Sequence, residues 1–179
     1  MRSLLFRSIV KKPVTVDGPA AGEAAAKELA AKLDKTARRV FGRSLAIREV
    51  DAGSCNGCEL EIHALNNPVY DLERFGLKFV ASPRHADVLL VTGPLTHNMR
   101  VALERTWKAT PDPKWVVALG DCACTGGVFA GSYACVGRVD AVVPVDLTIP
   151  GCPPRPIEIL QGLVALIEAA AGSDTARPR

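Results

Sequence analysis

The chain has 179 residues, of which 48% are hydrophobic and 5% aromatic, and it carries a formal net charge of +3. This length can bury one good core, so we expect one domain with an extension and not two full domains. The mild charge and the few aromatic side chains argue against nucleic acid as a partner.

The six cysteines bear on the compartment and on the kind of site to expect. The chain has no secretory signal and enough apolar residues to fold without staples, so a disulfide framework is not expected and a reducing compartment is. No apolar run reaches the roughly 18 residues that a membrane helix needs. The composition therefore predicts a soluble or peripheral protein whose thiols are free for other chemistry.

The first part of the chain divides into an arm and a helix. Residues 1–18 mix basic and apolar side chains, and we interpret them as an extended arm in preference to a membrane-surface segment. Residues 20–41 are rich in Ala, Glu, Lys and Leu and place Glu28 four residues before Lys32, a pattern typical of a helix. Residues 1–43 are thus predicted to form an arm and an Ala-rich helix outside the main domain.

Beyond this extension, short apolar runs alternate with helical patterns. Alternation of this kind predicts a parallel sheet covered on both faces, and hence a doubly wound, flavodoxin-like α/β domain over residues 44–171 with a tail at 172–179. The continuous apolar runs within it are typical of central parallel strands. The expected strands are 44–50, 77–81, 87–92, 115–119 and 141–145, and the expected helices are 58–67, 97–109, 154–171 and a short piece after Gly126.

Most of the cysteines follow predicted strands. Cys55 and Cys58 come after the first strand, Cys122 and Cys124 after the fourth, and Cys152 after the fifth. The carboxyl ends of parallel strands share one edge of a sheet, so these thiols are expected to converge. Neighbouring Gly and Pro residues allow sharp turns that bring backbone N–H groups near the sulfurs.

Thiols gathered in this way favour a metal or an iron-sulfur site. Four thiolates can hold a structural zinc ion, but zinc sites usually pair two short cysteine knuckles. One CxxC pair joined by widely separated single cysteines instead favours an iron-sulfur cluster, with zinc as the alternative. Spacing alone leaves open whether Cys122 or Cys124 is the third ligand.

Several motifs resemble the 20 kDa subunit family of complex I. Within that family the chain is most similar to small subunits of membrane-bound group 4 [NiFe]-hydrogenases, including the formate hydrogenlyase and hydrogenase-4 types. The resemblance covers about residues 44–168. The motifs that carry it are CNGCELEI (55–62), DLERFG (71–76), SPRHAD (82–87), TGPLT (92–96), PKW (113–115), GDC (120–122), VPVD (143–146) and PGCPP (150–154).

This resemblance implies a ligand set and a role. Cys55, Cys58, Cys122 and Cys152 match the family's four ligands to one [4Fe-4S] cluster, and Cys124 and Cys135 are then expected to be spare thiols. Complex I subunits carry two adjacent cysteines at the first site, whereas this chain has the CxxC spacing of the hydrogenases. The implied role is electron transfer beside a separate catalytic subunit, with no catalytic residue in this chain.

Partners and location follow from the same resemblance. It implies a large subunit of nickel-iron or 49 kDa-like type, other iron-sulfur subunits, and an indirect link to a membrane arm. The expected location is cytoplasmic, on the inner face of the cell membrane through those partners. The alternatives are the 20 kDa (B) subunit of an NADH:quinone oxidoreductase, passing electrons to quinone, and a zinc-stapled structural protein.

Overall fold

The computed structural model describes residues 28, 31–32, 35 and 44–173. Its centre is a five-stranded, all-parallel sheet with the strand order β2-β1-β3-β5-β7. This is the flavodoxin-like order of a doubly wound sheet, so the predicted fold is confirmed. The strands are β1 (Leu45–Asp51), β2 (Leu77–Phe79), β3 (Val88–Thr92), β5 (Trp115–Leu119) and β7 (Leu147–Ile149).

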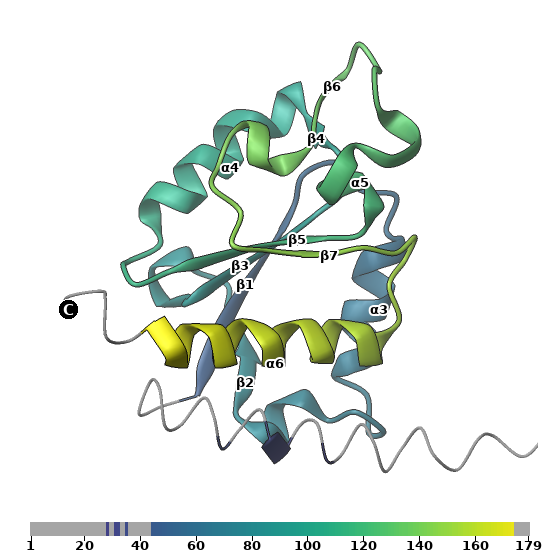
Figure 1. The fold of residues 1–179 in the computed structure, drawn as a ribbon. Helices are drawn as coiled ribbons and strands as arrows, with labels where there is room; N and C mark the ends of the chain where they lie inside the picture. The colour runs from purple at the N-terminus through teal and green to yellow at the C-terminus, as the bar shows by residue number, and fades with distance from the viewer. Residues whose placement is uncertain (1–27, 29–30, 33–34, 36–43, 174–179) are drawn as a thin grey trace, which may run out of the picture.

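Helices cover both faces of this sheet (Figure 1). Helices α3 (Gly57–Leu65) and α6 (Pro156–Ser173) pack on one face, and α4 (His97–Ala109) and α5 (Asp121–Thr125) pack on the other. A small antiparallel pair, β4 (Leu95–Thr96) with β6 (Cys135–Gly137), lies beside α4. The short 3-10 helices are η1 (Leu72–Phe75), η2 (Pro83–His85), η3 (Gly127–Phe129) and η4 (Val139–Ala141).

Strand β3 shows why the apolar runs form the centre. All five of its residues are buried. Val88 and Leu90 belong to the core under α3 and α6, whereas Leu89 and Val91 belong to the core under α4 and α5. A strand buried on both faces needs apolar side chains at every position, which is the pattern that predicted it.

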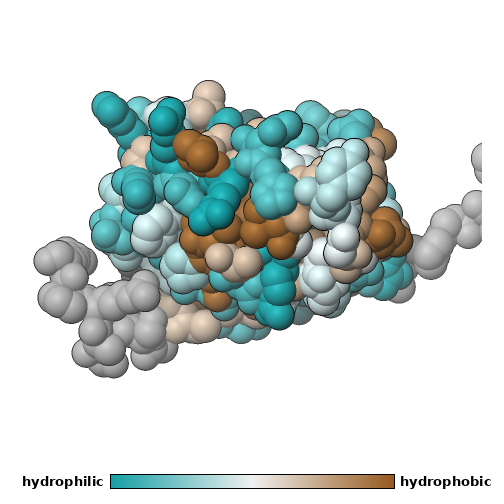
Figure 2. Space-filling model, turned by 90° about the horizontal axis from the view of Figure 1, so that it is seen from above, coloured by the Kyte–Doolittle hydropathy of each residue, from teal (hydrophilic) through white to brown (hydrophobic). Residues whose placement is uncertain are grey.

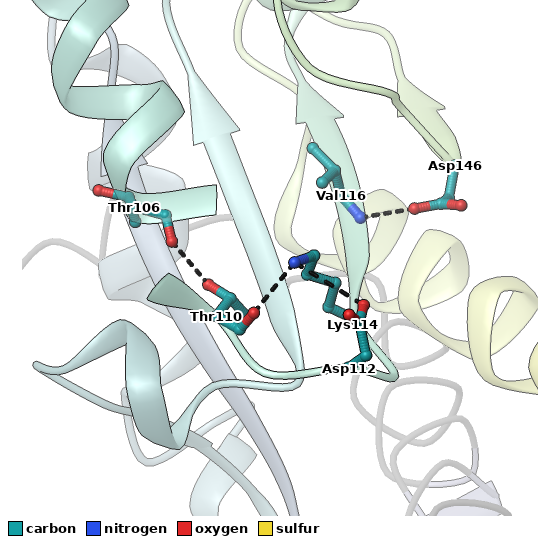
Figure 3. A network of polar contacts seen from close by, with 6 residues as sticks. All are labelled: Thr106, Thr110, Asp112, Lys114, Val116 and Asp146. Carbon is teal, nitrogen blue, oxygen red and sulfur yellow. Dashed lines mark hydrogen bonds and ion pairs between the residues drawn. The ribbon is translucent and has the colours of Figure 1, made fainter. Parts of the chain in front are cut away.

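The fifth strand was predicted in the wrong place. Residues 141–145 do not form a strand; η4 ends there, and β7 begins at Leu147. Pro144 has no N–H to give to a ladder, and Val143 packs into the core under α4 and α5. Pairing with β5 starts at Asp146, whose N–H donates to the Val116 carbonyl at 2.9 Å and whose Oδ2 accepts from the Val116 N–H at 2.8 Å (Figure 3).

The connection from α4 to β5 at the amino-terminal edge of the sheet is held by a polar network (Figure 3). Thr110 Oγ1 donates to the Thr106 carbonyl at 2.9 Å, and Lys114 Nζ donates to the Thr110 carbonyl at 3.0 Å. Lys114 also lies 3.7 Å from Asp112 Oδ1 and 4.5 Å from the ring centre of Trp107. These contacts explain the polar residues of this edge without any functional role.

The predicted amino-terminal extension is mostly outside the described residues, including the whole of the arm at 1–18. Within the predicted helix 20–41, residues 28, 31, 32 and 35 are described and are helical. Lys32 Nζ forms an ion pair of 2.7 Å with Glu168 Oε1 of α6. The predicted boundaries of the arm, domain and tail stay predictions.

Candidate metal centre

Three loops meet at the carboxyl edge of the sheet, to the right in Figure 1. They follow β1, β5 and β7. The loop after β5 is bonded to the loop after β7 by three contacts: Gly120 N–H to the Ile149 carbonyl at 2.7 Å, Asp121 N–H to the Gly151 carbonyl at 2.9 Å, and Gly151 N–H to Asp121 Oδ1 at 2.8 Å. These bonds hold the segments that carry Cys122 and Cys152 against each other.

The loop after β1 is shaped by the Asp51 side chain. Asp51 Oδ1 accepts from the N–H groups of Gly53 and Ser54, each at 2.7 Å, which closes a turn directly before the first cysteine. Asn56 then takes a left-handed conformation with φ 71°, and α3 begins at the next residue. The thiol of Cys58, in the first turn of α3, lies 3.9 Å from the Leu119 carbonyl at the end of β5. All three loops are therefore in contact.

Electrostatics shows that four thiols share this edge. Burial raises the pKa of Cys58 to about 12, and the next causes are the charge of Glu59 and then the Cys122, Cys55 and Cys152 thiolates. The pKa of Cys122 is also raised, by burial first and then by Cys152 and Cys55. Four thiolates this close repel one another, so they need a cation to be deprotonated together.

Glycines let the backbone approach the sulfurs. A Cβ on Gly120, which has φ +86°, would lie 2.6 Å from Cys58 Sγ, and one on Gly127 would lie 3.0 Å from Cys122 Sγ. A Cβ on Gly57 would lie 3.5 Å from Cys55 Sγ. No side chain intervenes at these points, and this close approach is what an iron-sulfur site requires of its surrounding loops.

The site opens to the surface. Cys55 and Cys152 are exposed, whereas Cys58 and Cys122 are partly buried. Large apolar side chains are also exposed near these loops: Leu60 of α3 at 60% and Val128 of η3 at 84%. Figure 2, which views the molecule from above the orientation of Figure 1, shows apolar side chains gathered among hydrophilic ones.

The two other cysteines lie differently. Cys124 Sγ donates to the Ala118 carbonyl at 3.4 Å, and the side chain packs against the core under α4 and α5. Burial is the main cause that raises its pKa, and none of the four thiols above contributes. Cys135 lies in β6, opposite Thr96 of β4. The geometry thus brings together the four cysteines predicted as ligands and turns Cys124 toward the core.

Some contributors to the site were not predicted. Helix α5 and the bonds of Asp121 were missed, although an Asp directly after a strand and a glycine is a signal for loop bonding. The histidines at 63, 85 and 97 are all exposed. Over residues 28, 31–32, 35 and 44–173, no group of three or more His, Cys, Asp or Glu lies close enough to hold a single metal ion.

A protein-family comparison identifies the chain's relatives. The family described as NADH ubiquinone oxidoreductase, 20 Kd subunit, matches residues 55–166. The chain belongs to this family of oxidoreductase subunits. The resemblance seen in the motifs is therefore confirmed.

Individual members of the family come from both of its branches. A probable membrane-bound hydrogenase subunit of Pyrococcus furiosus is 49% identical over 133 residues, which cover 74% of this chain and 80% of that protein. Formate hydrogenlyase subunit 7 of Escherichia coli is 46% identical over 150 residues, 84% of this chain, and the chain spans only 55% of its length. An NADH-quinone oxidoreductase subunit of Heliobacterium modesticaldum is 48% identical over 110 residues, covering 61% and 63% of the two chains.

Solved structures agree with this placement. A chain of the membrane-bound sulfane sulfur reductase, an archaeal respiratory membrane complex, has a TM-score of 0.66 and 35% identity, with 80% of this chain and 78% of that chain covered. A chain of an NAD+-reducing [NiFe]-hydrogenase, with a TM-score of 0.56, 20% identity and coverage of 71% and 93%, shares the fold. In the described part of this chain, no helix has the length and apolar character needed to cross a membrane.

Proposed function

We propose that Cys55, Cys58, Cys122 and Cys152 hold one [4Fe-4S] cluster and that the chain transfers electrons within a group 4 [NiFe]-hydrogenase-like complex. The observation that carries this proposal is the bonding of three cysteine-bearing loops into one edge of the sheet. Membership of the 20 kDa subunit family supports it.

The donor set suits a cubane. Thiolates are the ligands that iron-sulfur clusters take, and this site offers four from three loops. When bound, a [4Fe-4S] cluster stores and releases one electron at a time. The chain's own part is to hold the thiolates, to admit N–H groups near the sulfurs, and to leave Cys55 and Cys152 open toward a partner.

The metal content tests this assignment. Protein purified without air is expected to contain about four irons and four acid-labile sulfides per chain, the content of one cubane. The measurement is iron and sulfide analysis, with zinc determined on the same samples and cluster reconstitution applied to any iron-poor preparation. One equivalent of zinc without sulfide, after reconstitution has been attempted, would refute the cluster and favour the zinc-stapled alternative.

The hydrogenase branch is preferred because of the first cysteine pair. Asn56 and Gly57 separate Cys55 from Cys58, so no thiol stands next to Cys58 as in the complex I subunits. The second candidate is the role of the 20 kDa subunit in an NADH:quinone oxidoreductase, and the 48% identity to the Heliobacterium protein favours it. A large-subunit gene beside this one, with or without paired CxxC nickel ligands, would distinguish the two.

The partner is proposed to cover the open side of the cluster. Names of relatives such as the Pyrococcus furiosus and Escherichia coli proteins describe subunits of larger assemblies. We expect a large subunit to dock where Leu60 and Val128 are exposed, other iron-sulfur subunits to bind nearby, and the assembly to place this chain peripherally on the inner face of the cell membrane.

This docking predicts the effect of a charge in the apolar surface. Val128→Glu is expected to lose co-purification with the large subunit encoded beside it, because a carboxylate would be buried in the interface. The matched control is Val69→Glu, since Val69 is 48% exposed and lies beyond the far end of α3. Pull-down of the tagged chain measures the effect, with iron content and thermal unfolding compared. Equal recovery of the large subunit with both variants would contradict the proposed interface, and so would hydrogen oxidation by the isolated chain.

A further inference from the structure

A cavity of about 330 Å³ lies beside the cysteine site, between α3 and the carboxyl ends of β1 and β2. Its lining is mixed. Four of its residues carry charged or titratable side chains: Arg48, Glu49, Glu59 and His63. Ile62 and Phe79 are among its apolar residues. The cavity belongs to none of the contacts that hold the cysteine loops together.

The acidic groups of this cavity lack sufficient partners. Both carboxylate oxygens of Glu59 are buried, and neither has a hydrogen-bond partner among the described residues. The Arg48 guanidinium does not supply one, since its Nε is also buried without a partner. Glu49 accepts one long bond of 3.4 Å from Thr92 Oγ1. Burial and then the charge of Glu59 raise the pKa of Glu49.

An unpaired buried carboxylate is unfavourable because its lost hydration is not replaced. The cavity sets two carboxylates against one guanidinium, so it lacks one positive charge when His63 is neutral. A ligand that restores balance must be a cation with several N–H donors. Since both Glu59 oxygens are free, a planar fork that donates to both fits better than a single ammonium group.

We propose that this cavity receives the guanidinium group of an arginine side chain from a partner subunit, which binds Glu59 and neutralises the Glu49–Glu59 pair. The cavity is large enough for a guanidinium and part of its stem, and Phe79 and Ile62 offer apolar surface to that stem. Glu59 and the exposed Leu60 are neighbours on α3, so the cavity continues the apolar surface assigned above to the large subunit. The inference rests on the chain's place in a complex and does not depend on the cluster, which the iron analysis tests separately.

The probe for this site is n-butylguanidinium, with neutral n-butylurea as its isosteric control. Saturation-transfer NMR on the full chain is expected to show binding of the guanidinium and at least about tenfold weaker binding of the urea, the range for loss of a charged hydrogen bond. Glu59→Gln and Glu49→Gln should each weaken guanidinium binding by about tenfold or more for the same reason. Glu61→Gln is the matched control on the same helix, because Glu61 does not line the cavity.

The assembled complex decides who occupies the site. If a partner's arginine fills the cavity, n-butylguanidinium should bind the isolated chain but not the purified complex. Binding to both alike would overturn the partner assignment. Absence of guanidinium binding, equal binding of n-butylurea, or unchanged binding by Glu59→Gln would overturn the site itself. Iron content of each variant confirms that the change beside Cys58 has not altered the cluster.

Discussion

Cys122→Ser is expected to lose or convert the cluster, whereas Cys124→Ser is expected to leave it nearly unchanged. A serine hydroxyl is a poor replacement for a soft thiolate at an iron site. Cys122 interacts electrostatically with Cys55 and Cys152, while Cys124 donates to the Ala118 carbonyl and packs in the core. Two thiols only two residues apart should therefore differ sharply in their effect.

The readout for this pair is the electron paramagnetic resonance signal of the dithionite-reduced protein, with iron counted on the same samples. Matching changes at Cys55, Cys58 and Cys152 should behave like Cys122→Ser, and Cys135→Ser should behave like Cys124→Ser. A signal that survives in Cys122→Ser but disappears in Cys124→Ser would reverse the ligand assignment. If Cys124 moves in to rescue the first variant, the double change to serine should abolish the cluster.

The close pairing of β1, β3 and β5 explains how much of the fold could be predicted. Each of these strands is buried over most of its length, so its side chains are apolar almost without interruption. Helix α4 was predicted at its observed bounds because its apolar residues recur at helical spacing. Local pattern is sufficient where burial dictates every side chain.

The last strand and the loops needed information that no local pattern holds. The valines at 142, 143 and 145 look like a strand, but the pairing of Asp146 with Val116, thirty residues earlier, sets where β7 begins. Likewise the strand order predicted that the cysteines meet, yet only the structure shows that Asp121 bonds to Gly151 and that Glu59 is buried without a partner. Contacts of this kind join residues distant in sequence.

Glycine at position 120 provides the second large predicted effect. Gly120→Ala is expected to lose most of the bound iron, because the added Cβ would lie 2.6 Å from Cys58 Sγ and push this thiol away. Metal–ligand distances tolerate deviations of only about 0.2 Å, so the displaced thiol could not remain a ligand without rearrangement. The backbone adds its own cost, since φ +86° and ψ 157° are adopted almost only by glycine.

Gly131→Ala separates these two causes. Gly131 also has a positive φ, of +79°, but a Cβ there would meet nothing within 4 Å. Both variants should therefore lose stability on the order of 1–3 kcal/mol from the backbone, and only Gly120→Ala should also lose iron. Thermal unfolding of the cluster-free proteins measures the first effect, and iron analysis with the reduced-state paramagnetic signal measures the second. Full iron content in Gly120→Ala, or equal iron loss in both variants, would show that close approach at position 120 does not govern how Cys58 binds the cluster.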